Sequence, residues 1–156
     1  MKKFAIFAAS MLGCAMMSAQ PAPGSFEQTW TRGPEWLRDG VIYQVYPSSY
    51  KDSDGNGIGD IRGVISELDY IESLGVRAIW FNPLFVSGWI DGGYDVIDFY
   101  RVDPRFGTNN DMVELIEKAH AKGIKVMLDL VAGHTSDKHP WFIQSSQDTN
   151  LQYSDY

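Results

Sequence analysis

A carboxylate and an imidazole stand close together at the end of an apolar stretch. Asp129 interrupts the run from Ile124 to Val131, and His134 follows five residues after that acid. Such a run, set off by Gly123 and Gly133, predicts a strand buried on both faces of a parallel sheet. An acid there costs several kcal/mol unless it is hydrogen-bonded. Because ligands gather at the carboxyl ends of parallel strands, Asp129 and His134 are candidate binding residues; the alternative is a buried acid that holds its own loop beside a surface histidine.

A second group of acids lies in the sequence DSDGNGIGD, residues 52–60. Side chains with oxygen atoms alternate here with glycines, which let the chain curl tightly. A loop of this kind suits Ca²⁺, which binds about six to eight oxygens, and predicts a structural calcium site. The expected ligands are Asp52, Asp54, Asn56, the Ile58 carbonyl oxygen and Asp60. The loop begins like the helix-loop-helix calcium motif, but Gly63 stands where that motif has Glu. The alternative is a solvated acidic turn, in which the acids would repel one another.

The elements around these residues alternate between strand and helix. Strands are predicted at residues 41–46, 76–81 and 124–131, and helices at residues 35–38, 61–74 and 108–122. Parallel strands joined by right-handed crossovers are the default arrangement for this order, so the predicted fold class is α/β. All three strands are followed by loops rich in polar or aromatic groups, which favours a binding site along one edge of the sheet.

The longest of these loops, residues 84–98, is rich in aromatic and acidic side chains. It contains Trp89, Asp91, Tyr94, Asp95 and Asp98. A long loop of this composition after a strand suggests a binding surface. The alternative is an ordinary packed surface loop.

Composition bounds the size and the partners of the protein. The chain has 156 residues, of which 44% are apolar, enough for the core of one domain. Its formal net charge of −7 argues against nucleic acid as a partner.

The first 19 residues have the pattern of a secretory signal: a basic start, an apolar stretch and a small-residue cleavage site. This stretch is too short to span a bilayer as a mature helix, so no transmembrane segment is predicted and export to the periplasm or the medium is expected. Cys14 is the only cysteine, and Leu12-Gly13-Cys14 resembles a bacterial lipoprotein box. The alternative to simple secretion is therefore a lipid anchor at Cys14 in the outer membrane.

Three motifs together resemble the α-amylase family of glycoside hydrolases, family 13. They are GYDVID at 93–98 followed by VDPRFGT at 102–108, DLVAGH at 129–134, and the loop at 52–60, which resembles the metal loop of oligo-1,6-glucosidase-like members. The resemblance implies a (β/α)₈ TIM barrel with a domain inserted after its third strand. Residues 39–142 would then form the first three β/α units after a lead at 20–38, and the chain would be truncated at 143–156, the start of the inserted domain.

The resemblance also implies roles for single residues. Tyr94 would stack on the sugar on the non-reducing side of the cleaved bond, His134 would hydrogen-bond that sugar, and Asp129 would support the site from beneath. Asp91 falls where exo-acting α-glucosidases carry an acid that grips the terminal glucose. The family usually has Asn immediately before the histidine, whereas this chain has Gly133, which argues against the second calcium that many amylases bind there.

No residue of the chain is predicted to be catalytic. The family's retaining mechanism uses two carboxylates about 5 Å apart, which the resemblance places after later strands, beyond Tyr156. The full protein is expected to hydrolyse α-glucans or malto- and isomalto-oligosaccharides, and the isolated chain is expected to be inactive. The alternatives are a transglycosylase such as a trehalose synthase, and a non-catalytic sugar- or calcium-binding module.

Overall fold

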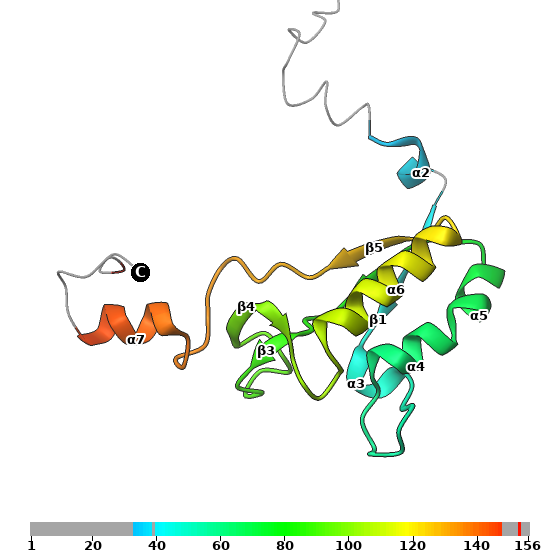
Figure 1. Cartoon of the computed structure of the whole chain (residues 1–156). Helices are drawn as coiled ribbons and strands as arrows, with labels where there is room; N and C mark the ends of the chain where they lie inside the picture. The colour runs from blue at the N-terminus through cyan, green and yellow to red at the C-terminus, as the bar shows by residue number, and fades with distance from the viewer. Residues whose placement is uncertain (1–32, 39, 148–152, 154–156) are drawn as a thin grey trace, which may run out of the picture. The chain divides into compact units, whose positions relative to one another are not determined.

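The computed structural model describes residues 33–38, 40–147 and 153 (Figure 1). The chain divides into two units, Met1–Pro34 and Glu35–Tyr156, and the fold lies in the second. The predicted leader at 1–19, with Cys14, lies outside the described residues, as do most of the lead at 20–38 and most of the segment at 143–156. In the part of the chain that is described, no helix has the length and apolar character needed to cross a membrane.

Three parallel strands form the sheet, with β2 in the centre. They are β1 (Val41–Val45), β2 (Val76–Phe81) and β5 (Lys125–Leu128). Val45 pairs with Phe81, which in turn pairs with Leu128, so the carboxyl ends of all three strands meet at one edge. The α/β class and the parallel arrangement are confirmed. The third strand is shorter than the predicted 124–131, although the Asp129 N–H still donates to the Phe81 carbonyl at 3.1 Å.

The prediction that the third strand is buried on both faces is wrong. Met127 is 37% exposed and Leu128 is 41% exposed, whereas Ile79 and Phe81 in β2 are fully buried. The reason is position in the sheet: β2 has a strand on each side and helices against one face, while β5 is an edge strand among the described residues. An apolar sequence supplies a surface that can be buried, but only a neighbour buries it.

The helices that connect the strands lie side by side along the sheet (Figure 1). They are α4 (Ile61–Ser66), α5 (Leu68–Ser73) and α6 (Asn109–Ala121). Ile71, Ile79 and Leu115, from a helix, a strand and a helix, are fully buried in one shared core. This core holds the sheet and thereby fixes where its carboxyl edge lies.

The single helix predicted at 61–74 is wrong, because the helix breaks at Glu67. The N–H of Glu67 turns back to the Val64 carbonyl at 3.0 Å, a tighter turn than the α-helix, and the Ser66 hydroxyl bonds the Gly63 carbonyl at 2.7 Å. A serine bonded to its own helix backbone competes with regular helix geometry. The helix predicted at 108–122 is confirmed as α6.

Residues 84–98 do not form the predicted loop throughout. Strands β3 (Phe85–Ser87) and β4 (Val96–Val102) pair as an antiparallel hairpin. The three acids and three glycines in 84–98 suggested a loop, although β-branched and aromatic residues, which favour a strand, form β4. The true loop is residues 88–95, and it carries Asp91 and Tyr94.

Three short helices complete the described chain: α2 (Glu35–Arg38), α3 (Pro47–Tyr50) and α7 (Pro140–Gln147). The first confirms the predicted turn of helix. The last runs into the segment at 143–156, which was expected to begin the inserted domain, and ends at Gln147. Trp141 in its first turn stacks on Phe99 of β4, with ring centroids 6.3 Å apart, so α7 is tied to the hairpin.

Candidate sugar-binding site

Tyr94 lies at the carboxyl edge of the sheet and links the hairpin loop to the end of β5. Its hydroxyl donates a hydrogen bond to the Oδ2 atom of Asp129 at 2.9 Å and accepts one from the Nδ2 atom of Asn82 at 3.1 Å. The Oδ1 atom of Asn82 accepts from the amide of Gln44 at 3.0 Å. Polar groups from the ends of three parallel strands and from one loop therefore meet at Tyr94.

The Asp129 carboxylate explains how an acid is tolerated at the end of an apolar strand. It accepts a hydrogen bond from the Tyr94 hydroxyl, which provides the partner that a half-buried carboxylate needs. Burial is the largest cause that raises the pKa of Tyr94, and the hydrogen bond to Asp129 raises it further. The phenol is therefore neutral at physiological pH and keeps donating to Asp129.

The loop at residues 88–95 is shaped around the buried side chain of Asp95. Its carboxylate accepts hydrogen bonds from the Ser87 hydroxyl at 2.7 Å and from the backbone N–H groups of Ile90 and Asp91, both at 3.2 Å. Burial alone would raise the pKa of Asp95, but these donors outweigh burial and lower it. The chain turn that carries Asp91 is thus held from the inside, while the Asp91 side chain stays exposed.

Trp89 fixes the same loop from the other side. Its indole N–H donates to the buried carboxylate of Asp103 at 2.8 Å, and the Arg105 guanidinium lies 3.8 Å from its ring centroid. Trp89 also has a positive φ of 58°, which is uncommon for a bulky residue. The indole contacts offset that conformational cost, so Trp89 has a packing role in this structure.

His134 is exposed and lies on the segment that follows β5. It lines a hollow of about 320 Å³ together with Phe99, Tyr100 and Trp141. Within the described residues no hydrogen bond joins it to Asp91, Tyr94 or Asp129. The structure therefore brings Tyr94 and Asp129 together, places Asp91 on the same loop as Tyr94, and leaves the predicted role of His134 without a contact that supports it.

The acidic loop at 52–60 brings three of its carboxylates close together. Oxygen atoms of Asp52, Asp54 and Asp60 lie within 4.8 Å of one another. The backbone N–H of Gly57, 2.7 Å from Asp52 Oδ2, is the largest cause that lowers the pKa of Asp52 and keeps it ionised. Asp60 has a second role, because its Oδ1 atom caps α4 by accepting from the Gly63 N–H at 2.7 Å.

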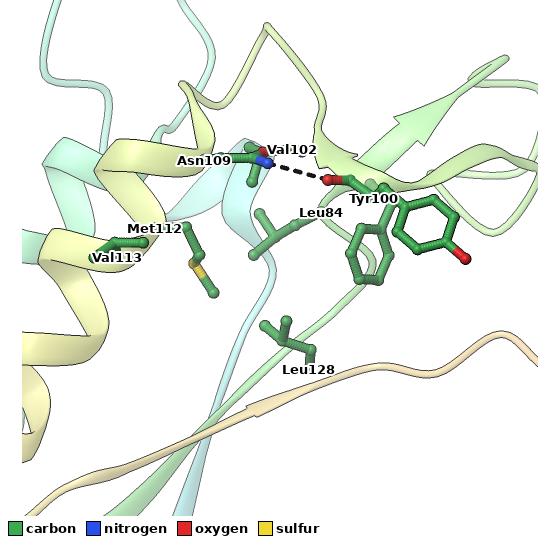
Figure 2. Close-up of a pocket in the computed structure, with 8 residues that line it drawn as sticks. Leu84, Tyr100, Val102, Asn109, Met112, Val113 and Leu128 are labelled. Atoms are coloured by element: carbon green, nitrogen blue, oxygen red, sulfur yellow. Dashed lines mark hydrogen bonds between the residues drawn. The ribbon is translucent and has the colours of Figure 1, made fainter.

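A separate groove of about 230 Å³ runs between the hairpin, α6 and β5 (Figure 2). Leu84, Val102, Met112 and Leu128 converge on it, and the hydrogen bond drawn there joins the Asn109 amide to the Tyr100 carbonyl at 3.0 Å. A sugar has a hydroxyl on most carbons and needs several polar partners. This apolar groove lacks them and does not suit a sugar.

The structure adds Gln44 and Asn82 to the predicted site residues. Both stand in strands or at strand ends, and a polar residue there gives no signal unless its neighbours in the sheet are known. Asn82 immediately follows β2 and precedes Pro83.

Comparisons with known proteins agree with this geometry. Residues 44–156 match the model of the α-amylase catalytic domain. The oligo-1,6-glucosidase of Heyndrickxia coagulans is 47% identical over 122 residues, which cover 78% of this chain and 22% of that protein. The trehalose-6-phosphate hydrolase of Escherichia coli is 50% identical over 112 residues, which cover 72% of this chain and 20% of that protein.

Solved structures show the same relationship. The trehalose-6-phosphate hydrolase of Bacillus licheniformis matches with a TM-score of 0.76 and 46% identity, over 78% of this chain and 22% of that one. The MutB E254Q mutant, solved with its substrate sucrose, matches with a TM-score of 0.76 and 42% identity. The match covers 80% of this chain and 22% of MutB. The chain thus spans about 22% of the length of most of these relatives. Its three parallel strands are N-terminal units of a TIM barrel, and the chain belongs to the α-amylase family of glycoside hydrolases.

Proposed function

We propose that the protein carrying this barrel segment is a retaining α-glucosidase that removes glucose from the non-reducing end of malto- or isomalto-oligosaccharides. The observation that carries the proposal is the Tyr94–Asp129 hydrogen bond at the carboxyl edge of the sheet. The bond anchors the polar end of the phenol, so that the ring can present an apolar face to a sugar. Asp91, exposed on the same loop, supplies a carboxylate for hydroxyl groups of the terminal glucose.

We assign the acids at this edge a structural role, in which they hold neighbouring groups in place and do not take part in bond cleavage. Asp129 accepts the Tyr94 phenol, and Asp95 accepts three hydrogen bonds from its own hairpin. A nucleophile and an acid/base need free carboxyl groups about 5 Å apart on either side of the scissile bond. We therefore propose that these two groups come from later strands of the barrel.

Calcium is proposed as a structural ion in the loop at 52–60. The three converging carboxylates suit a hard cation, and the lowered pKa of Asp52 and of Asp60 keeps both ionised. An ion there would cancel the repulsion between the acids and stabilise the loop that leads into α4. It would take no part in bond cleavage.

The test is hydrolysis by the full natural protein. Glucose release from maltose and isomaltose is expected, with no attack on a long glucan whose non-reducing ends are blocked. Asp91→Asn should lower kcat/KM on maltose by about tenfold or more, the scale of a lost charge-assisted hydrogen bond, whereas Asp137→Asn should not. Cleavage of the blocked glucan would overturn the exo assignment, and sugar binding without any turnover would favour the non-catalytic module.

A second candidate is a synthase that transfers the glucosyl group within the same substrate. MutB is a trehalulose synthase, and its complex with the substrate sucrose matches this chain with the same TM-score, 0.76, as the trehalose-6-phosphate hydrolase. This equal similarity favours keeping the synthase as a candidate. Incubation with sucrose distinguishes the two: a hydrolase releases glucose and fructose, whereas a synthase yields an isomeric disaccharide.

Export is also proposed, from the leader at residues 1–19. The test is N-terminal sequencing of the protein recovered outside the cytoplasm. A new terminus near Gln20 supports simple secretion, and a lipid-modified Cys14 supports the anchored alternative.

A further inference from the structure

Four polar side chains form a continuous line across the carboxyl edge of the sheet. The Gln44 amide donates to Asn82 at 3.0 Å, the Asn82 amide donates to Tyr94 at 3.1 Å, and the Tyr94 hydroxyl donates to Asp129 at 2.9 Å. The family resemblance gave roles to the last two residues. It gave none to Asn82, which stands between them and the rest of the sheet.

The direction of this line follows from its last member. The Tyr94 hydroxyl has a single proton, which it donates in the hydrogen bond to the Oδ2 atom of Asp129. The phenol oxygen is then left to accept, and only the NH₂ group of Asn82 can donate to it. The Asn82 oxygen must in turn face Gln44, which supplies a second NH₂ group. Each amide therefore has one allowed orientation.

Asn82 is itself held in place by the backbone. Its N–H donates to the Val45 carbonyl at 3.0 Å, which extends the ladder between β1 and β2 beyond the last paired residues. The next residue, Pro83, packs closely against the hairpin loop: a Cβ atom on Gly93, whose φ is +105°, would lie 3.2 Å from the Pro83 carbonyl oxygen. The amide that contacts Tyr94 thus comes from a rigid part of the barrel.

We propose that Asn82 is a positioning residue that sets the orientation of the Tyr94 ring. The inference rests on the proposed function, in which that ring stacks on the sugar. Held by Asp129 alone, the phenol could pivot about a single hydrogen bond. A second bond from Asn82, arriving from a different strand, removes that freedom. A misplaced ring shifts the sugar relative to the reacting groups, so the effect falls on kcat as well as on KM.

The effect of Asn82 on the orientation of the Tyr94 ring can be tested without measuring activity. In the full natural protein labelled with 3-fluorotyrosine, the fluorine resonance of Tyr94 is assigned by its loss in Tyr94→Phe. Asn82→Ala is expected to shift and broaden that resonance, whereas the exposed control Asn110→Ala is expected to leave it unchanged. A Tyr94 resonance that does not respond to Asn82→Ala overturns the inference, even if the protein is an active glucosidase.

Kinetic measurements distinguish a role of Asn82 in positioning Tyr94 from a role in folding alone. Asn82→Ala is expected to lower kcat/KM for p-nitrophenyl α-glucoside by about tenfold, the scale of one hydrogen bond. Asn82→Asp should be impaired at pH 7, because a carboxylate cannot donate to the phenol. Its activity relative to wild type should recover at acid pH, where the introduced carboxyl is protonated and can donate again.

Two controls distinguish the possible failures. Asn110→Asp adds the same charge away from Tyr94 and should show no recovery at acid pH. A constant ratio of Asn82→Asp to wild type across pH would mean that Asn82 acts only in folding. If the wild-type protein shows no glycosidase activity, the proposed function fails, while the fluorine measurement still decides whether Asn82 orients Tyr94.

Discussion

At the residue scale, the edge of the sheet depends on acids whose hydrogen bonds hold neighbouring groups in place. Asp129 holds the Tyr94 phenol, and Asp95 holds the turn on which Asp91 stands. An acid used in this way acts through the residue that it positions. Where the pKa of such a carboxylate is lowered, local structure becomes sensitive to pH, because protonation removes an acceptor.

The Asp95 carboxylate is the clearest case. Its pKa is lowered in the folded protein, so the stability that it contributes is present above the unfolded-state pKa of about 3.9 and is lost as pH falls through the lower folded pKa. Asp95→Asn should destabilise the fold by about 1–3 kcal/mol at pH 7, because an amide cannot accept from all three donors. Urea denaturation at pH 7 and in the acid range measures this.

The exposed Asp137 provides the matched control for that experiment. Asp137→Asn should leave the denaturation midpoint at pH 7 almost unchanged. Equal midpoints for Asp95→Asn and wild type at pH 7 would mean that the hydrogen bonds around Asp95 contribute nothing to stability.

At the element scale, helix ends decide where helices begin and how firmly they stand. Thr108 and Asp111 form a reciprocal cap on α6: the Thr108 backbone N–H donates to Asp111 at 2.8 Å, and the Asp111 N–H donates to the Thr108 hydroxyl at 3.2 Å. Arg62 of α4 pairs with the same Asp111 at 2.7 Å, so one acid joins two helices.

Removal of this cap should weaken α6. Thr108→Ala is expected to lower the free energy of unfolding by about 1–2 kcal/mol, since the Asp111 N–H loses its acceptor. Thr108→Ser keeps the hydroxyl and should retain most of the stability. Chemical denaturation of the three proteins gives the comparison, and equal losses in both variants would show that the methyl group matters rather than the cap.

The loop at 52–60 is a second element whose stability can be tested. If it binds calcium, a chelator should lower the Tm of the full protein, and added Ca²⁺ should restore it, because a ligand that binds only the folded state stabilises it. Asp54→Ala should abolish this response. Asp54 is the informative choice, since Asp60 also caps α4 and its loss would confuse the result.

The control for the calcium experiment is an acid outside the loop. Asp69→Ala, which removes an exposed ion pair with Lys122, should keep the full response to Ca²⁺. A Tm that is the same with chelator and with calcium in the wild-type protein would reject the structural ion.

At the scale of the whole molecule, the described sheet has two edges that carry apolar side chains. Val41 in β1 is 59% exposed, and Leu128 in β5 is 41% exposed. In a closed barrel both edges would be paired and both faces covered. Unpaired edges with apolar residues favour association with other chains.

A protein made only of these 156 residues is therefore expected to aggregate or to stay partly unfolded, and to show no turnover. Sedimentation velocity and a thermal melt test this directly. A soluble monomer that melts cooperatively would show that the segment is a stable unit without the rest of a barrel.

The sequence alone indicated the three parallel strands, the helices α2 and α6, and the family. The bounds of β2 and the place of α6 followed from apolar periodicity and from residues that stop strands and helices. These signals depend on neighbours within a few positions. The motifs at 93–98 and 129–134 carried the family resemblance for the same reason, because each is a short, continuous string.

Tertiary structure decided what those strings do together. The hairpin within 84–102, the exposed faces of β5 and the line from Gln44 through Asn82 and Tyr94 to Asp129 all depend on which strands are neighbours and in what register. Tyr94 and Asp129 are separated by 35 residues in sequence and by one hydrogen bond in space. Only the packed sheet, which aligns the ends of β1, β2 and β5, turns residues distant in the chain into a single site.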